Sequence, residues 1–221
     1  MNLPDTLLPF NWYAIAHFLA AAFMLRAAMK TPWHRFSRQL ILNLWLGGCV
    51  ALMTLWTMKT GIRPGLNFHL LGATAMTLMF GPELAVVGMA VILAGSTAFG
   101  YSDWQSYSMN LLLMGILPVR ISYGIYWLVD KKLPNHFFVY IFLNAFLGAA
   151  IAIASTGLVS SLILAMGGAY TFDYLKSSYL PYFILMGWSE ALLSGMALTL
   201  MVVYRPDWVS TFDDARYIHN K

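Results

Sequence analysis

Long apolar runs separated by short polar stretches form the main pattern of this 221-residue chain. A helix that crosses a bilayer needs roughly 17–25 mainly apolar residues, and about seven windows of the chain meet this requirement. The third window is short, and the sixth is long enough to tilt or to end in irregular backbone at Gly167 and Gly168. The pattern therefore predicts an all-α integral membrane protein with transmembrane helices near residues 12–29, 39–58, 67–81, 83–100, 107–129, 136–166 and 179–204.

The positions of lysine and arginine predict how these helices are oriented, because loops that face the cytoplasm carry the excess of positive charge. With the N-terminus outside, three basic residues fall in outer loops, namely Lys59, Arg63 and Lys176. The same orientation puts nine on the inner side: Arg26, Lys30, Arg35, Arg38, Lys131, Lys132, Arg205, Arg216 and Lys221. We therefore expect an outside N-terminus and a cytoplasmic C-terminus. We expect one polytopic domain over residues 1–221, made of a buried N-terminal segment (1–11), a transmembrane bundle (12–204) and a cytoplasmic tail (205–221).

Composition supports a membrane location and narrows the function. Hydrophobic residues make up 60% of the chain and charged residues 10%, whereas about a quarter of a soluble domain is charged. The net charge of +4 comes from a few loop residues, so we expect no nucleic-acid partner. The sole cysteine, Cys49, lies in an apolar run and is interpreted as a buried thiol. No GxxxxGK(S/T), HExxH or GxSxG motif occurs, so we expect no ATP hydrolysis by this chain and no enzyme.

Polar residues inside the predicted spans are costly in hydrocarbon and tend to mark sites. We interpret Asn43 and Asn144 as residues that hydrogen-bond between helices, and His17 as a residue with a structural hydrogen bond. Arg120 lies two residues after Pro118, and Glu190 is the counter-charge that we expect for it. The full set is His17, Asn43, His69, Asn110, Arg120, Asn144 and Glu190.

His69 differs from the others because it follows the Pro/Gly segment RPGLNF (residues 63–68) and begins an apolar run. An imidazole beside irregular backbone can bind a metal while loop groups complete the ligand shell. The N-terminal segment MNLPDTLLP (residues 1–9) strengthens this hypothesis. It has no Lys or Arg, unlike the start of a signal peptide, so we expect Met1 to be retained.

Leu3, Leu7 and Leu8 favour burial of this segment, and a buried free amine with adjacent amides can supply nitrogen ligands. Nitrogen ligands in a plane suit nickel or copper(II). The alternative is an apolar segment that lies on the membrane surface.

These segments resemble the CbiM/NikM family, the substrate-binding membrane components of cobalt and nickel energy-coupling-factor transporters. The family begins with a Met-His-Ile-Pro-Asp-like segment, which here is MNLPD (residues 1–5), and later carries a Gly-His-Leu-Leu-Gly-Ala core, which here is FHLLGAT (residues 68–74). LMFGPELAVVGMAVIL (residues 78–93) and SMNLLLMG (residues 108–115) also resemble family segments. The similarity covers residues 1–9 and roughly 62–116.

The resemblance implies a metal site at Met1, the backbone of Asn2, and His69. Asp5 is implied as support around these ligands, and His17, Asn67 and Asn110 are further candidates for support or for an extra ligand. The chain departs from the family where Asn2 replaces a histidine and Leu113 replaces an asparagine. One imidazole ligand is therefore missing, and His17 is a possible replacement.

The resemblance implies a membrane-embedded capture component for Ni²⁺ or Co²⁺ in an energy-coupling-factor-type ABC importer of the bacterial inner membrane. Its implied partners are a transmembrane coupling subunit and ATPase subunits. Gly47 and Ala51 form a surface of small residues that suits helix docking, and ordinary packing inside the bundle is the alternative interpretation. One alternative is transport of copper or another metal, since Met76 lies seven residues from His69 and would share its helical face. Another alternative is a non-transporting assembly or scaffold protein that kept the fold.

Overall fold

The computed structural model describes residues 2–219, and within them five continuous helices are long and apolar enough to cross a membrane. Two of these are α1 (Phe10–Lys30) and α2 (Gln39–Thr57). The third joins α5 (Tyr107–Asn110), the π-helical η2 (Leu111–Ile116) and α6 (Leu117–Lys132). The fourth joins α7 (Phe137–Val139), the π-helical η3 (Tyr140–Leu147) and α8 (Gly148–Met166), and the fifth is α10 (Tyr182–Tyr204).

Shorter elements connect these helices, namely η1 (Trp33–Ser37), α3 (Ala73–Phe80), α4 (Pro82–Ala98) and α9 (Phe172–Ser178). After α10 the C-terminal tail contains η4 (Pro206–Trp208) and η5 (Ala215–His219). A hairpin of β1 (Thr60–Arg63) and β2 (Leu66–Phe68) precedes α3, with Thr60 opposite Phe68 and Gly61 opposite Asn67.

The predicted third span, residues 67–81, is wrong in its first half. Only Ala73–Phe80 is helical, because β2 and a non-helical turn occupy the residues before it. Gly72 precedes α3 and Gly81 follows it, with φ of +66° and +87°. Such positive φ values do not belong to a right-handed helix and favour glycine, so α3 begins after Gly72 and ends before Gly81. His69 therefore lies outside the helix, and the predicted helical face shared by His69 and Met76 does not exist.

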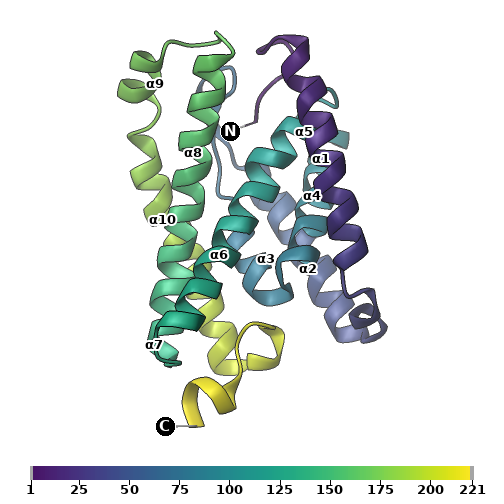
Figure 1. Ribbon diagram of the computed structural model, residues 1–221, viewed down its shortest axis with the longest axis vertical. Coiled ribbons are helices and arrows are strands. Elements are labelled where there is room, and N and C mark those ends of the chain that lie inside the picture. The colour runs from purple at the N-terminus through teal and green to yellow at the C-terminus, as the bar shows by residue number, and fades with distance from the viewer. Residues whose placement is uncertain (1, 220–221) are drawn as a thin grey trace.

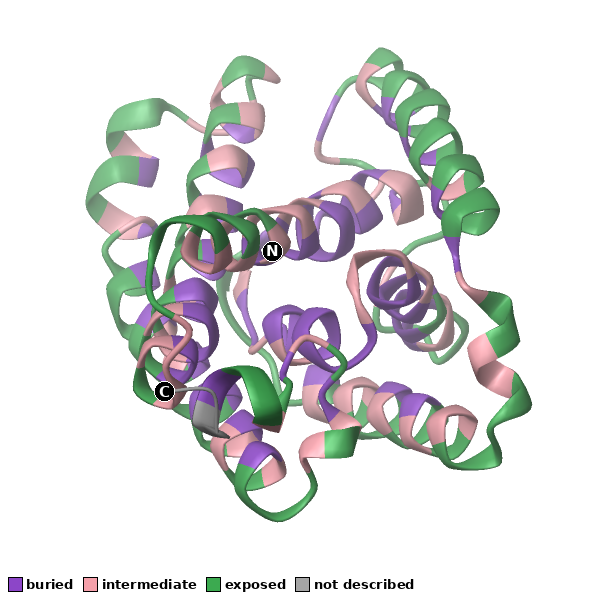
Figure 2. Cartoon of the chain, turned by 60° about the horizontal axis from the view of Figure 1, so that its bottom comes forward, coloured by how far each residue is buried: buried purple, intermediate pink, exposed green. Residues whose placement is uncertain are grey.

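α3 is the centre of the bundle. It packs against α4, α6, α8 and α10, and almost all of its side chains are buried (Figures 1 and 2). Gly88 of α4 allows this helix to approach α3 closely, since a Cβ at position 88 would lie 2.7 Å from Cε of Met76 in α3. The longer helices surround this core and place the short α3 deep inside the molecule.

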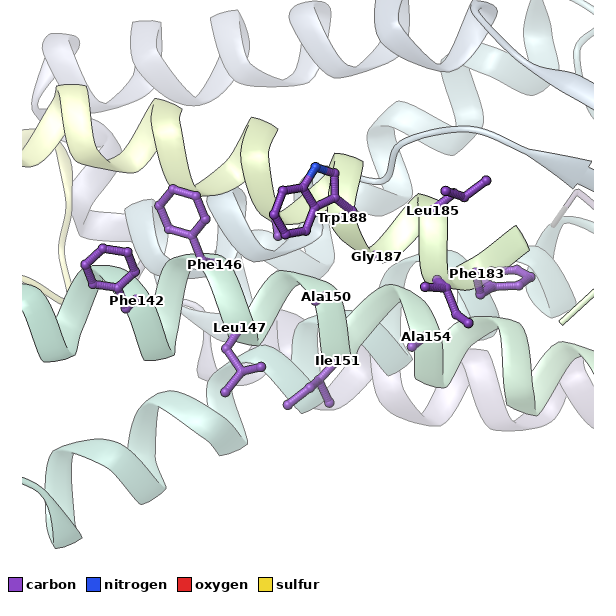
Figure 3. A pocket seen from close by; sticks show the side chains of 12 residues that line it. Phe142, Phe146, Leu147, Ala150, Ile151, Ala154, Phe183, Leu185, Gly187 and Trp188 are labelled. Carbon is purple, nitrogen blue, oxygen red and sulfur yellow. The ribbon is translucent and has the colours of Figure 1, made fainter. Parts of the chain in front are cut away.

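The outer surface of the bundle is strongly apolar. Phe18 on α1 is 76% exposed and Trp188 on α10 is 70% exposed. A shallow groove of about 740 Å³ runs between α10 and the helix made of η3 and α8, and Figure 3 shows aromatic side chains along it, among them Phe142, Phe146 and Trp188. Large apolar side chains facing outward all around a bundle match a lipid environment, so these helices form a membrane protein.

The C-terminal tail closes the lower end of the bundle beneath α3 (Figure 1). The N–H of Ser210 donates to the carbonyl of Met79, and Oγ1 of Thr211 donates to the carbonyl of Leu78 at 2.8 Å. Arg216 pairs with Asp130 of α6 at 2.8 Å. The tail is thus attached to both α3 and α6.

Three expectations about polar residues need correction. Arg120 pairs with both carboxylate oxygens of Glu83 at the start of α4, at 3.0 and 3.1 Å, so the predicted pair with Glu190 is wrong. Asn43 accepts from Gln39 in the same helix and makes no interhelical bond in the described residues. Asn144 is buried in η3, and its side-chain atoms have no hydrogen-bond partner within the described part of the chain. Local sequence could not separate Glu83 from Glu190 as the partner of Arg120.

Candidate metal site

The N-terminal segment folds back into the upper half of the bundle before α1 begins (Figure 1). Leu3 and Leu8 are buried, which anchors the segment by its apolar side chains. The hydroxyl of Tyr13 donates to the carbonyl of Pro4 at 2.6 Å and accepts from the N–H of Leu8 at 3.2 Å. Through Tyr13, the first turn of α1 thereby holds residues 4–8 in a conformation that places Asn2 in the interior of the bundle.

Two asparagine side chains hold the backbone of this segment. Oδ1 of Asn67 accepts from the N–H of Asn2 at 2.7 Å, and Nδ2 of Asn67 donates to the carbonyl of Asn2. Asn110 does the same one residue later, with Oδ1 accepting from the N–H of Leu3 at 2.8 Å and Nδ2 donating to its carbonyl at 3.0 Å. A carboxamide offers both a donor and an acceptor, so each one pairs with the N–H and the carbonyl of a single residue. We call Asn67 and Asn110 the asparagine clamp.

A polar cavity of about 250 Å³ adjoins the clamp, and Asn2, Lys59, Asn67, Tyr101 and Asp103 are among the residues that line it. Nδ2 of Asn2 and Nζ of Lys59 both donate to the carbonyl of Tyr101, at 3.3 and 2.7 Å. Partial burial lowers the pKa of Lys59, and Asp103 opposes this shift. Oδ1 of Asn2 is buried and has no hydrogen-bond partner among the described residues.

His69 is 3% exposed and lies at the turn that follows β2. Its Nδ1 is 3.1 Å from the carbonyl of Leu70. Since a carbonyl only accepts, this contact assigns the proton to Nδ1 and leaves a lone pair on Nε2. Nε2 is buried and has no partner within the described residues. A neutral imidazole with one nitrogen held by a carbonyl and the other open is a metal-ligand arrangement.

Two distant helices support the turn at His69. The indole ring of Trp56 lies with its centroid 4.9 Å from that of the imidazole, and its Nε1 donates to the carbonyl of Leu71 at 3.2 Å. Glu190 of α10 accepts from the N–H groups of Leu71 and Gly72 at 2.8 and 2.7 Å. This role of Glu190 could not be predicted from the sequence, because no local pattern joins Glu190 to a turn 118 residues earlier.

The structure brings together only some of the predicted site residues. Asn2, Asn67 and Asn110 meet through the clamp, while the N–H of Asp5 donates to Asp103 at 3.3 Å. Met1 lies outside the described residues. His17 is on the exposed face of α1, where its Nδ1 pairs with Oγ of Ser108 at 2.7 Å. Among the described residues, no three His, Cys, Asp or Glu side chains gather as a metal site.

The fold and this site define a helical membrane protein with a buried histidine and an N-terminal segment that is anchored in the bundle. The chain belongs to the CbiM family, described as the cobalt uptake substrate-specific transmembrane region, which matches residues 2–208. This confirms the family predicted from the N-terminal and HLLGA segments. Members of this family are metal-transport components of the membrane and not enzymes.

Individual relatives agree with this assignment. The cobalt transport protein CbiM of Desulforamulus reducens is 25% identical over 147 residues, which is 63% of this chain and 56% of that protein. A solved truncated transition metal transporter superposes with a TM-score of 0.79 at 18% identity, covering 92% of this chain and 99% of its own. A second transition metal transporter has a TM-score of 0.78, also at 18% identity, with 91% and 92% coverage. At this identity the structures establish the shared fold.

Proposed function

We propose that this chain captures a transition-metal ion, Ni²⁺ or Co²⁺, as the substrate-binding component of an energy-coupling-factor-type ABC importer in the bacterial inner membrane. The observation that supports it most is the buried Nε2 of His69, which carries a lone pair and has no partner in the described residues. An unsatisfied buried polar atom is costly, and a bound cation would satisfy it. The ion is the substrate of the protein.

The proposed ligands are nitrogens of the amine of Met1, the backbone of Asn2 and the imidazole of His69. Coordination by the Asn2 amide displaces its proton, which in the metal-free structure is donated to Oδ1 of Asn67. Binding through this nitrogen therefore costs a hydrogen bond and should strengthen as pH rises. Asn2 has no imidazole, so a fourth position is left for water or for its Oδ1, which has no hydrogen-bond partner among residues 2–219.

We propose an outside N-terminus and seven membrane passages, with α3 and α4 completing the passages made by the five longer helices. The basic residues at the ends of α1 and α6 and in the tail support this orientation. Energy would come from separate ATPase subunits through a coupling subunit, because the sequence has no nucleotide-binding loop. Gly47 and Ala51 are exposed on α2 and support helix docking there.

Replacement of His69 tests the proposed function. Protein purified in detergent with an untagged N-terminus should bind Ni²⁺ or Co²⁺ near one ion per chain, measured by metal analysis and titration calorimetry. His69→Ala should lose the ion, because the remaining nitrogens form an incomplete shell. His17→Ala is the matched control, since that histidine is exposed and pairs with Ser108. Full stoichiometry and unchanged affinity in His69→Ala would show that the site lies elsewhere.

A further inference from the structure

Glu190 is a carboxylate in the middle of a membrane helix, and it is only 2% exposed. The ion pairs found among the described residues join Arg120 to Glu83 and Arg216 to Asp130, so neither involves Glu190. A carboxylate in this position is expensive and needs strong hydrogen-bond donors. The backbone N–H groups of Leu71 and Gly72 both donate to it, one to each carboxylate oxygen.

The N–H of Gly72 belongs to the N-cap residue of α3, where a helix leaves its first N–H groups without internal partners, and the N–H of Leu71 belongs to the residue before it. Gly72 is the N-cap residue with φ of +66°, and no side chain from the neighbouring sequence caps this end. Glu190 supplies the cap from α10, and its negative charge also suits the positive end of the helix dipole. The position of the turn therefore depends on a residue from another helix.

The same turn carries His69. The carbonyl of Leu70 fixes Nδ1 of the imidazole, and the carbonyl of Leu71 receives the indole N–H of Trp56, whose ring packs on the imidazole. A shift of the backbone at Leu71 and Gly72 would thus move the groups that fix the ring. We call residues 69–72 the histidine turn.

Building on the proposed function, we infer that Glu190 is a positioning residue for the metal site, holding the histidine turn so that Nε2 of His69 is aimed at the ion. Hydrogen-bond partners that orient a metal ligand typically change metal affinity by about 10- to 100-fold when they are replaced. Glu190 does not contact the ion or the imidazole; it acts on His69 through the backbone of Leu71 and Gly72.

Glu190→Gln tests this inference because it keeps the side-chain shape but turns an NH₂ group toward one of the two N–H donors. Co²⁺ affinity should fall about tenfold or more, and the visible absorption bands of bound Co²⁺ should shift as the imidazole reorients. Hydrogen exchange at Leu71 and Gly72 should accelerate in the metal-free protein. Glu190→Asp should restore part of the affinity, since it keeps both acceptor oxygens.

Glu83→Gln is the matched control, because it removes a partly buried carboxylate that pairs with Arg120 at the start of α4. It should leave Co²⁺ affinity, absorption bands and exchange in the histidine turn unchanged. If Glu190→Gln does not fold, Trp56→Phe gives the second test, since it keeps a ring on the imidazole but removes the donor to Leu71. It should shift the Co²⁺ bands in the same way with a smaller loss of affinity.

Wild-type affinity and absorption bands in folded Glu190→Gln, or in Trp56→Phe, would overturn the inference. Slow exchange at Leu71 and Gly72 in Glu190→Gln would also contradict it. The exchange measurement needs no metal, so it separates the two proposals. Suppose that the wild-type protein binds no Co²⁺, but Glu190→Gln still accelerates hydrogen exchange at Leu71 and Gly72. The proposed function would then fail, while the role of Glu190 in positioning the histidine turn would stand.

Discussion

At position 2 the chain carries a carboxamide where the CbiM/NikM pattern has an imidazole. Asn2 is 8% exposed and borders the polar cavity, where its Oδ1 has no partner among the described residues. A carboxamide oxygen is a harder, weaker ligand for Ni²⁺ or Co²⁺ than an imidazole nitrogen. With Asn2, the proposed site should therefore bind Ni²⁺ or Co²⁺ more weakly than a site with histidine at this position.

Asn2→His should tighten Ni²⁺ or Co²⁺ binding, because a second imidazole completes a four-nitrogen shell next to a cavity with room for the ring. We expect at least about a tenfold lower Kd, equivalent to ~1.4 kcal/mol, by titration calorimetry. Asn2→Gln is the control, since it adds length but no imidazole, and it should bind no more tightly than wild type.

An extension before Met1 provides the complementary measurement. A short Gly-Ser tag removes the free amine from its proposed place and should abolish metal binding in both wild type and Asn2→His. Equal binding with and without the tag, together with no gain from Asn2→His, would remove the N-terminus from the ligand set.

How far the site could be predicted differs from residue to residue. His69 could be predicted as a metal ligand because Pro64 and Gly65 precede it. These two residues interrupt the helical pattern, so the imidazole is expected beside irregular backbone. Asn67 and Asn110 were candidates, but their pairing with the backbone of Asn2 and Leu3 spans 65 and 107 residues. Such pairings depend on tertiary packing, which local patterns do not encode.

At the scale of elements, the asparagine clamp joins three parts of the chain, namely the N-terminal segment, β2 and α5. Asn110 is fully buried, and besides Leu3 it also donates to Oγ of Ser102 and Ser106. Removing a buried amide that pairs with both the N–H and the carbonyl of one residue leaves two backbone groups without that partner. The N-terminal segment should thus depend on Asn110 for its place in the bundle.

Asn110→Ala should lower the free energy of unfolding in detergent by about 1–3 kcal/mol, because the N–H and carbonyl of Leu3 lose their partners. It should also make the N-terminal segment accessible to proteases. The matched control is Asn43→Ala on the exposed side of α2, whose amide pairs with Gln39. Its effect should stay within about 0.5 kcal/mol, and equal losses in both variants would refute a specific role for the clamp.

Hydropathy identified the long helices but could not find the ends of α3. Residues 69–80 are almost uniformly apolar, so a strand end, a turn and a short helix look alike in a sliding window. The physical signal was in the glycines, since Gly72 and Gly81 take positive φ on both sides of the helix. The π-helical segments η2 and η3 have no such signal and continue the apolar pattern of their helices.

At the scale of the whole molecule, charge is distributed unequally between the two ends of the bundle. Lys30 and Lys132 end α1 and α6 at the same end as the tail, whereas the β-hairpin and α9 lie at the other end (Figure 1). With the N-terminus outside, this agrees with the excess of positive charge expected in the cytoplasm.

Gln105→Cys should react with a membrane-impermeant maleimide in intact cells, because its loop lies at the proposed outer end. Lys132→Cys is the matched control and should react only after the membrane is opened. Cys49 is the only native cysteine and is 2% exposed, so the background should be low. The opposite labelling pattern would reverse the proposed orientation.

The attachment of α3 to late parts of the chain has a consequence for biosynthesis. Its upper end is capped by Glu190, 118 residues after Gly72, and its lower end is bound by Thr211, 133 residues after Leu78. A ribosome therefore delivers the histidine turn and α3 long before Glu190 and Thr211, and contacts of such sequence separation form late. The proposed metal site would therefore take its final shape only after α10 has been inserted, and a partly synthesised chain would not yet carry a formed site.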